Sequence, residues 1–298
     1  MLFQQIACNK RKTVGIMGLF VIILALVGAG LGYLFSDRPV LGLVIAVIFS
    51  IIYMLIVLPN PANMVMSLNH AQEVHEQDNP ELWHVVGDMA LVGQVPMPRV
   101  FIIADPSPNA FATGRDPNHS AVAVTQGLLD MMNREELEGV LGHEISHIRN
   151  YDILVSTIAA VLVGVISYLS GIASRYIWWI DDDRDRDDNN GGSIVVIFKV
   201  IAILFVLILG PICASLAQMA LSRNREYLAD ASSVELTRNP QGLISALEKI
   251  DGSAPMKKAD PSSAGMYIED PLRKRRSFTH LFDSHPPTAD RIKRLEKM

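Results

Sequence analysis

Four long apolar runs without charged residues dominate the hydropathy pattern of this chain. They cover residues 14–35, 40–58, 153–174 and 200–221. An α-helix rises about 1.5 Å per residue, so roughly 20 residues cross a hydrocarbon core of about 30 Å. Each run reaches that length, and we therefore predict four transmembrane helices. For the last two runs, a pair of helices buried inside the protein is the alternative.

Residues 1–58 are predicted to form a tight transmembrane hairpin. Only the four residues 36–39 separate its two apolar runs, and the first run is longer than the apolar core of a signal peptide. Residues 153–221 would form a second hairpin, either transmembrane or buried. The two hairpins leave residues 59–152 and 222–298 as the two parts of a domain outside the membrane.

The distribution of basic residues predicts which side of the membrane this domain occupies. Basic residues next to a span favour the cytoplasmic side. Residues 10–12 before the first run read Lys-Arg-Lys, and Arg223 and Arg225 follow the fourth run. The loop between the third and fourth runs is mainly acidic at residues 181–188. Both parts of the domain are therefore expected in the cytoplasm.

The polar segments contain signals for both helices and strands. Pairs of Asn and Pro at positions 79–80 and 239–240 are typical helix starts, and Asn133 with Glu136 forms a capping box. Short β-type runs lie at residues 99–104, 110–113 and 121–125. A last helix is expected from Thr288, whereas the polar stretch 251–270 is expected to be poorly ordered. The predicted fold class is a mostly α membrane protein with an α+β domain.

Composition agrees with a protein that lives in a lipid bilayer. Hydrophobic residue types make up 50% of the 298 residues and charged types only 19%, an apolar excess for a soluble domain of this size. The net charge of −5 gives no indication of nucleic-acid binding. The two cysteines, Cys8 and Cys213, lie beside and inside apolar runs, so we expect neither a disulfide nor a zinc site made of cysteines.

The helix that the capping box opens contains the sequence His143-Glu144-Ile145-Ser146-His147. Histidines four residues apart lie on one face of a helix and can bind one metal ion. Zinc favours imidazole nitrogens. Glu144, next to the first ligand, is in the position of the general base that activates a water in a metallopeptidase. The spacing therefore predicts a catalytic Zn²⁺ site.

A catalytic zinc requires a third protein ligand and an open position. Glu226 is the best candidate, because Asp230 lies four residues later on the same helix face and could receive the second N–H of a ligand histidine. An ordinary solvated helix face is the alternative. His147 precedes the third and fourth runs and Glu226 follows them, so the two meet only if both runs cross the membrane or neither does.

At this point the sequence resembles the M48 metallopeptidases. His143-Glu144-x-x-His147, Glu226-x-x-x-Asp230 and His285-Pro286-Pro287-x-x-x-Arg291 look like the three motifs of that family. With its length and two N-terminal spans, the chain is most similar to the bacterial heat-shock membrane proteases of the family. The resemblance implies a zincin-like domain, zinc on His143, His147 and Glu226, catalysis by Glu144, and a supporting role for Asp230.

The resemblance also implies a biological role. Such enzymes cut damaged or unassembled membrane proteins, or other unfolded polypeptides, at the cytoplasmic face of the bacterial inner membrane. A peptidase must also stabilise an oxyanion, and His285 or Arg291 could donate to it. The alternatives are that His285 caps the last helix and that Arg291 forms a surface salt bridge.

Two weaker patterns and two rival functions complete the interpretation. Residues 109–112 are either an edge strand that pairs with substrate or a plain core strand, and the basic run 273–276 contacts lipid headgroups or is simply solvated. A prenyl-peptide processing protease is disfavoured by the short chain and its few spans. A non-catalytic zinc-binding membrane scaffold is disfavoured by Glu144, which a purely structural site does not need.

Overall fold

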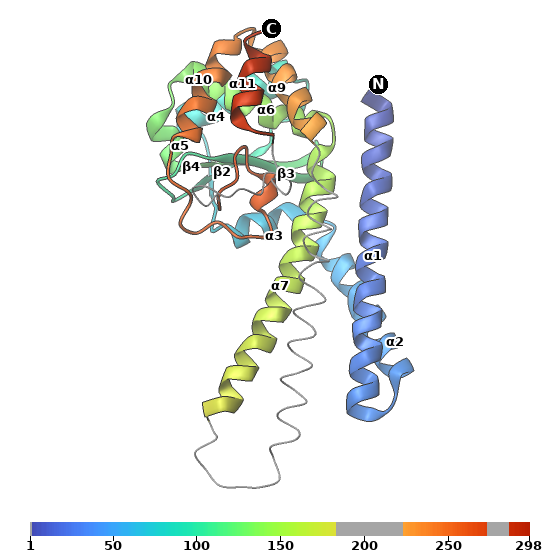
Figure 1. The fold of residues 1–298 in the computed structure, drawn as a ribbon. Helices are drawn as coiled ribbons and strands as arrows, with labels where there is room; N and C mark the ends of the chain where they lie inside the picture. Colours follow the sequence, from blue (N-terminus) through green and yellow to red (C-terminus); the bar gives the residue numbers. More distant parts are fainter. Residues whose placement is uncertain (1, 183–222, 273–285) are drawn as a thin grey trace.

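The computed structural model describes residues 2–182, 223–272 and 286–298 (Figure 1). Long helices extend in one direction from a body that combines helices with a β-sheet. The fourth apolar run, the basic run 273–276 and His285 lie outside the described residues. The predictions made for them stay predictions.

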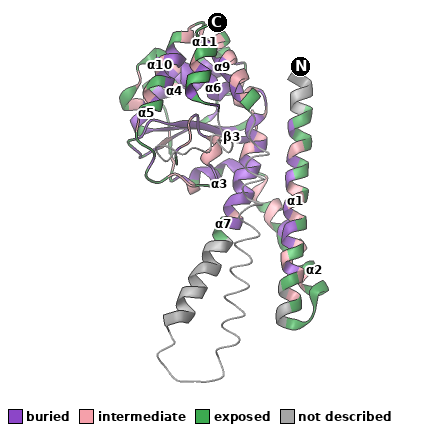
Figure 2. Cartoon of the chain, in the orientation of Figure 1, coloured by how far each residue is buried: buried purple, intermediate pink, exposed green. Residues whose placement is uncertain are grey.

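The first two apolar runs form a helical hairpin. Helix α1 covers Leu2–Ser36 and α2 covers Pro39–Val57. The two helices approach closely at glycines: a Cβ added to Gly42 would overlap the backbone carbonyl of Gly28. Most large side chains on α2 are exposed to the surroundings (Figure 2), as expected for a helix that faces lipid.

The third apolar run forms helix α7, Asp152–Asp182. Within the described residues, Ala7–Gly30 and Pro39–Val57 are long and apolar enough to cross a membrane. A third candidate is counted only if helix α6, Arg134–Arg149, and the first part of α7 are taken as one span bent by 86°. Two to three candidate spans are thus present, and the predicted count of four is not established.

The sheet has four strands in the order β1-β2-β4-β3. Strand β2 (Arg99–Ile103) pairs in parallel with β4 (His119–Thr125), and β4 pairs antiparallel with β3 (Ala110–Asp116). The short strand β1, Gln72–Val74, was not predicted because only one of its three residues is even partly buried. Strand β3 is the edge of the sheet nearest to α7 (Figure 1).

Helix α6 lies in the centre of the main hydrophobic core. It packs against β3, α4 (Pro80–Val92), α9 (Arg223–Thr237) and α10 (Pro240–Asp251). Helices α3 (Pro61–Leu68), α5 (Gln126–Met131) and α11 (Thr288–Leu295) complete the body. The predicted caps are confirmed, since Asn79, Asn133 and Asn239 each accept a hydrogen bond from the first turn of the helix that follows. This α+β body agrees with the predicted class.

The expectation that residues 251–270 are poorly ordered is wrong. Tyr267 is fully buried and stacks edge-on against Phe111 with a centroid distance of 4.7 Å. Its hydroxyl donates to Asn69 Oδ1 at 2.9 Å, and Ser263 bonds to the same side-chain oxygen at 3.0 Å. Ile268 N donates to the carbonyl of Ala110 on β3 at 2.9 Å. A few apolar anchors and mutual hydrogen bonds order a segment whose composition is polar.

Candidate metal centre

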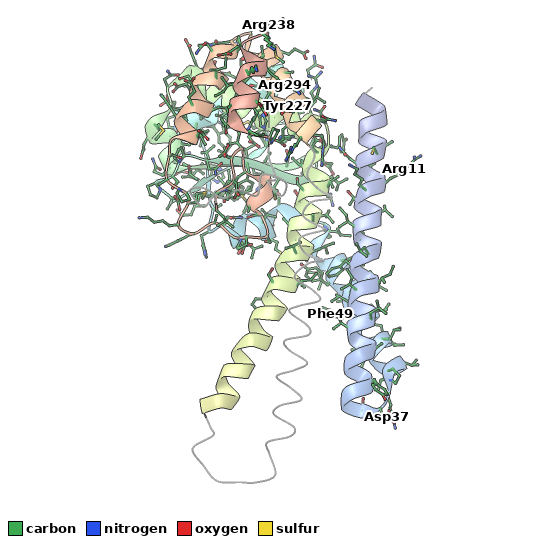
Figure 3. The ribbon with its side chains drawn as sticks, viewed as in Figure 1. Arg11, Asp37, Phe49, Tyr227, Arg238 and Arg294 are labelled. Atoms are coloured by element: carbon green, nitrogen blue, oxygen red, sulfur yellow. The ribbon has the colours of Figure 1, made fainter. Side chains whose placement is uncertain are left out.

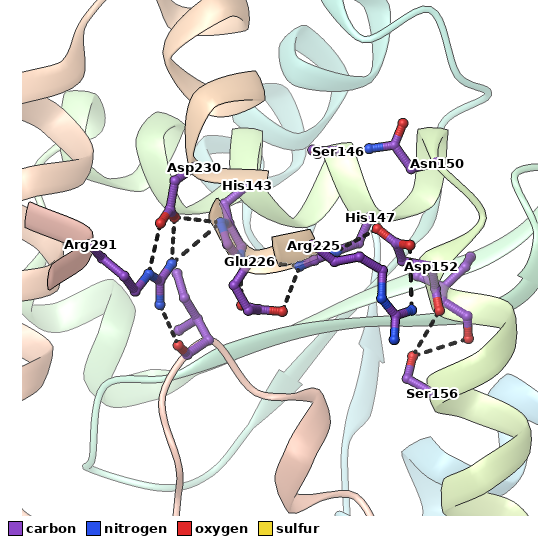
Figure 4. Close-up of polar contacts among 12 residues, drawn as sticks. His143, Ser146, His147, Asn150, Asp152, Ser156, Arg225, Glu226, Asp230 and Arg291 are labelled. Atoms are coloured by element: carbon purple, nitrogen blue, oxygen red, sulfur yellow. Dashed lines mark hydrogen bonds and ion pairs between the residues drawn. The ribbon is translucent and has the colours of Figure 1, made fainter. Parts of the chain in front are cut away.

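Two histidines from α6 converge at the surface of the core (Figure 4). The side-chain Nε2 atoms of His143 and His147 are 3.2 Å apart, and their ring centroids are 4.8 Å apart. Their spacing of four residues puts them on one helix face. The capping box at Asn133 and Glu136 fixes the start of that helix, so local sequence determines where both rings lie.

Glu226 on α9 completes a cluster of three candidate ligands. Its carboxylate oxygens lie 3.5 Å from His143 Nε2 and 3.6 Å from His147 Nε2. In tetrahedral geometry, ligand atoms that are each about 2.0–2.1 Å from one zinc ion lie about 3.3–3.4 Å apart. The observed separations match that value. Two imidazoles and one carboxylate are also a donor set of catalytic zinc sites, so these residues fit the metal that the sequence predicted.

A carboxylate holds the outer nitrogen of each histidine. Asp230 Oδ1 lies 3.0 Å from His143 Nδ1, and Asp152 Oδ2 lies 3.2 Å from His147 Nδ1. Because Nδ1 donates its proton to a carboxylate, the lone pair of Nε2 points to the shared centre. The sequence indicated Asp230 but not Asp152, which follows His147 by five residues and reads as the first residue of an apolar helix.

The structure gives Arg291 a different role from the oxyanion donor considered above. Its guanidinium is fully buried and donates to both oxygens of Asp230, at 2.9 and 2.6 Å, and to the carbonyl of Ile268 at 2.9 Å. Its Nη2 also lies 3.4 Å from His143 Nδ1, and among the described residues none of its hydrogen bonds is to Glu144. Nor is it the surface salt bridge of the alternative interpretation. Arg291 is a buried support for Asp230 and, through Asp230, for His143.

Glu144 lies beside the histidines and is one of the residues that line a small pocket. The pocket has a volume of about 30 Å³, enough for a water molecule, and its lining includes Ala112, Glu144, His147, Ile153, Ser156 and Gly265. Neither carboxylate oxygen has a hydrogen-bond partner among the described residues. The peptide group of Ala112 is close enough to lower the pKa of Glu144 slightly, but not in hydrogen-bonding geometry. A buried carboxylate without a hydrogen-bond partner requires an explanation, and a bound water or ion is the usual one.

The charges around the cluster favour a bound cation. Burial lowers the pKa of His143, but hydrogen bonds to Asp230 and Glu226 outweigh it and raise the pKa to about 9. Burial alone would raise the pKa of Asp230. The charges and hydrogen bonds of Arg291 and His143 outweigh that effect and lower the pKa to about 2. Without a metal ion, the hydrogen bonds to Asp230 and Glu226 favour the protonated form of the His143 imidazole. A divalent cation would take over that positive charge.

Comparisons with known proteins agree with the geometry. The profile of Peptidase family M48 matches residues 76–298. Two relatives described as "Protease HtpX homolog", from Lactobacillus acidophilus and Lactobacillus helveticus, are 74% and 73% identical over the full length of both chains. A third relative with this description, from Ligilactobacillus salivarius, is 59% identical over the same extent.

A solved structure described as "Crystal Structure of S. mikatae Ste24p" is 18% identical and overlaps with a TM-score of 0.46, over 99% of this chain and 66% of that chain. The family profile and the three full-length relatives confirm the resemblance that the motifs indicated. The chain therefore belongs to Peptidase family M48, and with its two long apolar helices it is a membrane metalloprotease.

Proposed function

We propose that this protein is a zinc-dependent endopeptidase that cuts polypeptides at the cytoplasmic face of the bacterial inner membrane. The observation that carries the proposal is the unpartnered Glu144 carboxylate in a pocket beside His143, His147 and Glu226. Burial of an acid without partners costs folding free energy. A purely structural metal site does not require such a residue.

His143, His147 and Glu226 would hold the metal ion. A bound Zn²⁺ would supply Lewis-acid polarisation of the scissile carbonyl. Glu144 would accept a proton from the attacking water and pass it to the leaving amine. Burial raises the pKa of Glu144, while the two histidines partly offset the increase, which suits a group that must both accept and release a proton. His285 remains our proposed donor to the oxyanion.

The position of the pocket supports polypeptides near the membrane as substrates. Ile153 and Ser156, from the first turns of α7, line one side of it, and Ala112 on β3 lines another. The outer edge of β3 is already covered next to Ala112: Ile268 N bonds to Ala110, and the Thr157 hydroxyl contacts the backbone of Gly114. A substrate would therefore have to present an unfolded segment to this small pocket. Damaged or unassembled membrane proteins meet that requirement. Their removal would give the enzyme a role in the stress response.

The contacts of α1 support a cytoplasmic active site. Asn9 bonds to Asp152, so the basic residues 10–12 lie on the same side of the hairpin as the pocket. The labelled Arg11 lies at the end of α1 beside the body, and Asp37 lies in the turn at the opposite end (Figure 3). Basic residues that flank a span stay in the cytoplasm, and the site would stay there with them.

Metal removal tests the enzymatic proposal. Purified full-length protein in detergent should degrade unfolded casein, lose this activity with a chelator and regain it with Zn²⁺. A His147→Ala variant should not regain it at the same Zn²⁺ concentration, because one of three ligands is missing. Chelator-resistant cleavage would contradict the proposal.

Cysteine labelling tests the orientation. In a background without Cys8 and Cys213, Asp37→Cys should react with an impermeant reagent in intact cells. Arg238→Cys, exposed on the body at the end of α9, should react only after permeabilisation. The reverse pattern would place the active site outside.

A further inference from the structure

We propose that Asn9, near the start of α1, is a positioning residue that holds Asp152 in the orientation needed to support His147. The inference rests on the proposed metal site, because His147 matters here as a ligand. It assigns part of the metal centre to a transmembrane helix that lies outside residues 76–298, the part of the chain that matches the family profile.

The contacts form a continuous path from α1 to the ligand. Asn9 is buried, with 4% of its surface exposed, and its Nδ2 donates to Asp152 Oδ1 at 2.9 Å. The other oxygen of the same carboxylate, Oδ2, lies 3.2 Å from His147 Nδ1. A carboxylate that is held at one oxygen cannot rotate freely at the other. Arg225 Nη1 reaches the same Oδ1 at the longer distance of 3.4 Å. The Asn9 amide, at 2.9 Å, makes the shorter contact and therefore restricts the angle at which Asp152 receives the imidazole N–H.

Asn9 also holds the backbone corner on which Asp152 lies. Helix α6 ends at Arg149 and α7 starts at Asp152, with an angle of 86° between them. Tyr151, between the helices, has a φ of +58°, a conformation that non-glycine residues adopt only when their surroundings enforce it. The Asn9 amide reaches the carbonyl of Asn150 at 3.4 Å, and the Lys10 ammonium lies 5.5 Å from the centre of the Tyr151 ring.

Packing fixes the position from which Asn9 acts. Ile16 and Phe20 on α1 are fully buried in one cluster with apolar residues of α7, among them Ile158 and Leu162. A docked α1 presents its amide at a defined point. The simpler interpretation is that Asn9 only helps α1 to dock. Thr13 offers a matched control for that role, because it is a buried polar residue one turn later whose hydroxyl, among the described residues, bonds only to the carbonyl of Asn9 within α1.

The test compares Asn9→Ala, Asn9→Gln and Thr13→Ala in full-length protein in detergent. Zn²⁺ affinity is measured by competition with a chromophoric chelator, and kcat and KM are measured on a fluorogenic casein. Loss of a group that orients a metal ligand costs about 10-fold to 100-fold in affinity or activity. We expect Asn9→Ala to weaken Zn²⁺ binding about 10-fold and to lower kcat with KM unchanged. Asn9→Gln, which keeps the amide, should recover part of both, and Thr13→Ala should change neither.

Each outcome decides the matter. If Asn9→Ala and Thr13→Ala have the same Zn²⁺ affinity and the same kcat, the inference is overturned. So would a variant that unfolds at lower temperature in its metal-free form but binds Zn²⁺ like the wild type, since that result indicates docking alone. His147→Ala separates the two proposals. If His147→Ala binds Zn²⁺ as tightly as the wild type, the proposed metal site is wrong. If His147→Ala loses Zn²⁺ binding while Asn9→Ala binds Zn²⁺ like the wild type, only the proposed role of Asn9 is wrong.

Discussion

The two histidines of the metal centre are held from different parts of the molecule. His143 is held by Asp230 and, behind it, by Arg291, all within the helical body and all almost fully buried. His147 is held by Asp152, where α1 meets the start of α7, and Asp152 is bonded in turn by Asn9 at 2.9 Å and by Arg225 at 3.4 Å. Its side chain is 15% exposed and faces the pocket.

The support of His143 is buried in the core, whereas the support of His147 lies at the pocket. The Asp230–Arg291 pair excludes water and has two short hydrogen bonds, so it fixes one ligand within the core. Asp152, the partner of Asn9, lines the pocket together with Glu144 and His147. One ligand is thus tied to the stability of the body, and the other to the docking of a membrane helix. Substitutions on the two sides should affect different measurements.

The largest expected effect is on the His143 side. Arg291→Met leaves Asp230 buried without its partner, and breaking a buried ion pair costs about 3–5 kcal/mol. Chemical denaturation should show a loss of that size. Arg294→Met is the control on the same helix, because Arg294 is exposed and stacks on Tyr227 at 3.6 Å (Figure 3). It should cost less than about 1 kcal/mol, and equal losses would remove the contrast.

The two supporting carboxylates sharpen the comparison. Asp152→Ala should weaken Zn²⁺ binding by about 10-fold to 100-fold with a smaller change in the unfolding free energy, because its charged partner Arg225 is partly exposed and 3.4 Å away, whereas Arg291 is fully buried. Asp230→Ala should weaken binding by a similar factor and also destabilise the fold, because the buried charge of Arg291 loses its partner. Chelator competition and denaturation on the same samples would measure both. If Asp152→Ala destabilises the fold as much as Asp230→Ala, the two sides are not distinct.

A smaller effect is expected in the segment that covers the edge of β3. Tyr267→Phe removes the hydroxyl that bonds to Asn69 at 2.9 Å. Loss of one such hydrogen bond costs about 0.5–1.5 kcal/mol. Thermal unfolding should register this loss, and Zn²⁺ affinity should not change because the hydroxyl contacts no group of the metal centre. Weaker Zn²⁺ binding by Tyr267→Phe would show that the segment is a third support of the site.

The smallest effect is expected at Lys10. Its ammonium lies 5.5 Å from the Tyr151 ring in a partly exposed place, where such contacts contribute about 0.5–1 kcal/mol. Lys10→Met should therefore change Zn²⁺ affinity by no more than about 5-fold. If Lys10→Met weakens Zn²⁺ binding as much as Asn9→Ala does, the Lys10 ammonium rather than the Asn9 amide supports the junction of α6 and α7.

The sequence predicted what depends on residues close together in the chain. The caps at Asn79, Asn133 and Asn239 were identified because a cap needs only the first turn of its own helix. The facing histidines followed from a spacing of four residues on one helix. The pairing of Glu226 with them could be anticipated because Asp230 follows it by four residues, because two apolar runs, an even number, lie between the two motifs, and because the motifs resemble those of a known family.

What the sequence missed depends on contacts between distant segments. Asn9 and Asp152 are 143 residues apart and meet because α1 packs along α7. Arg291 and Asp230 are 61 residues apart, and only the fold shows that the arginine faces inward. Residues 251–270 looked disordered because composition does not reveal that Tyr267 fills the core and that Asn69 satisfies its hydroxyl.

The central claim is that Glu144 acts on water beside a metal ion that other residues hold. Zinc content and casein cleavage of the full-length Glu144→Gln protein test it most directly. We predict that the variant retains about one equivalent of zinc, because Glu144 is not a ligand, and that cleavage falls by at least about 10²-fold, the usual contribution of a general base. Cleavage at the wild-type rate, or loss of the zinc together with the activity, would contradict the account.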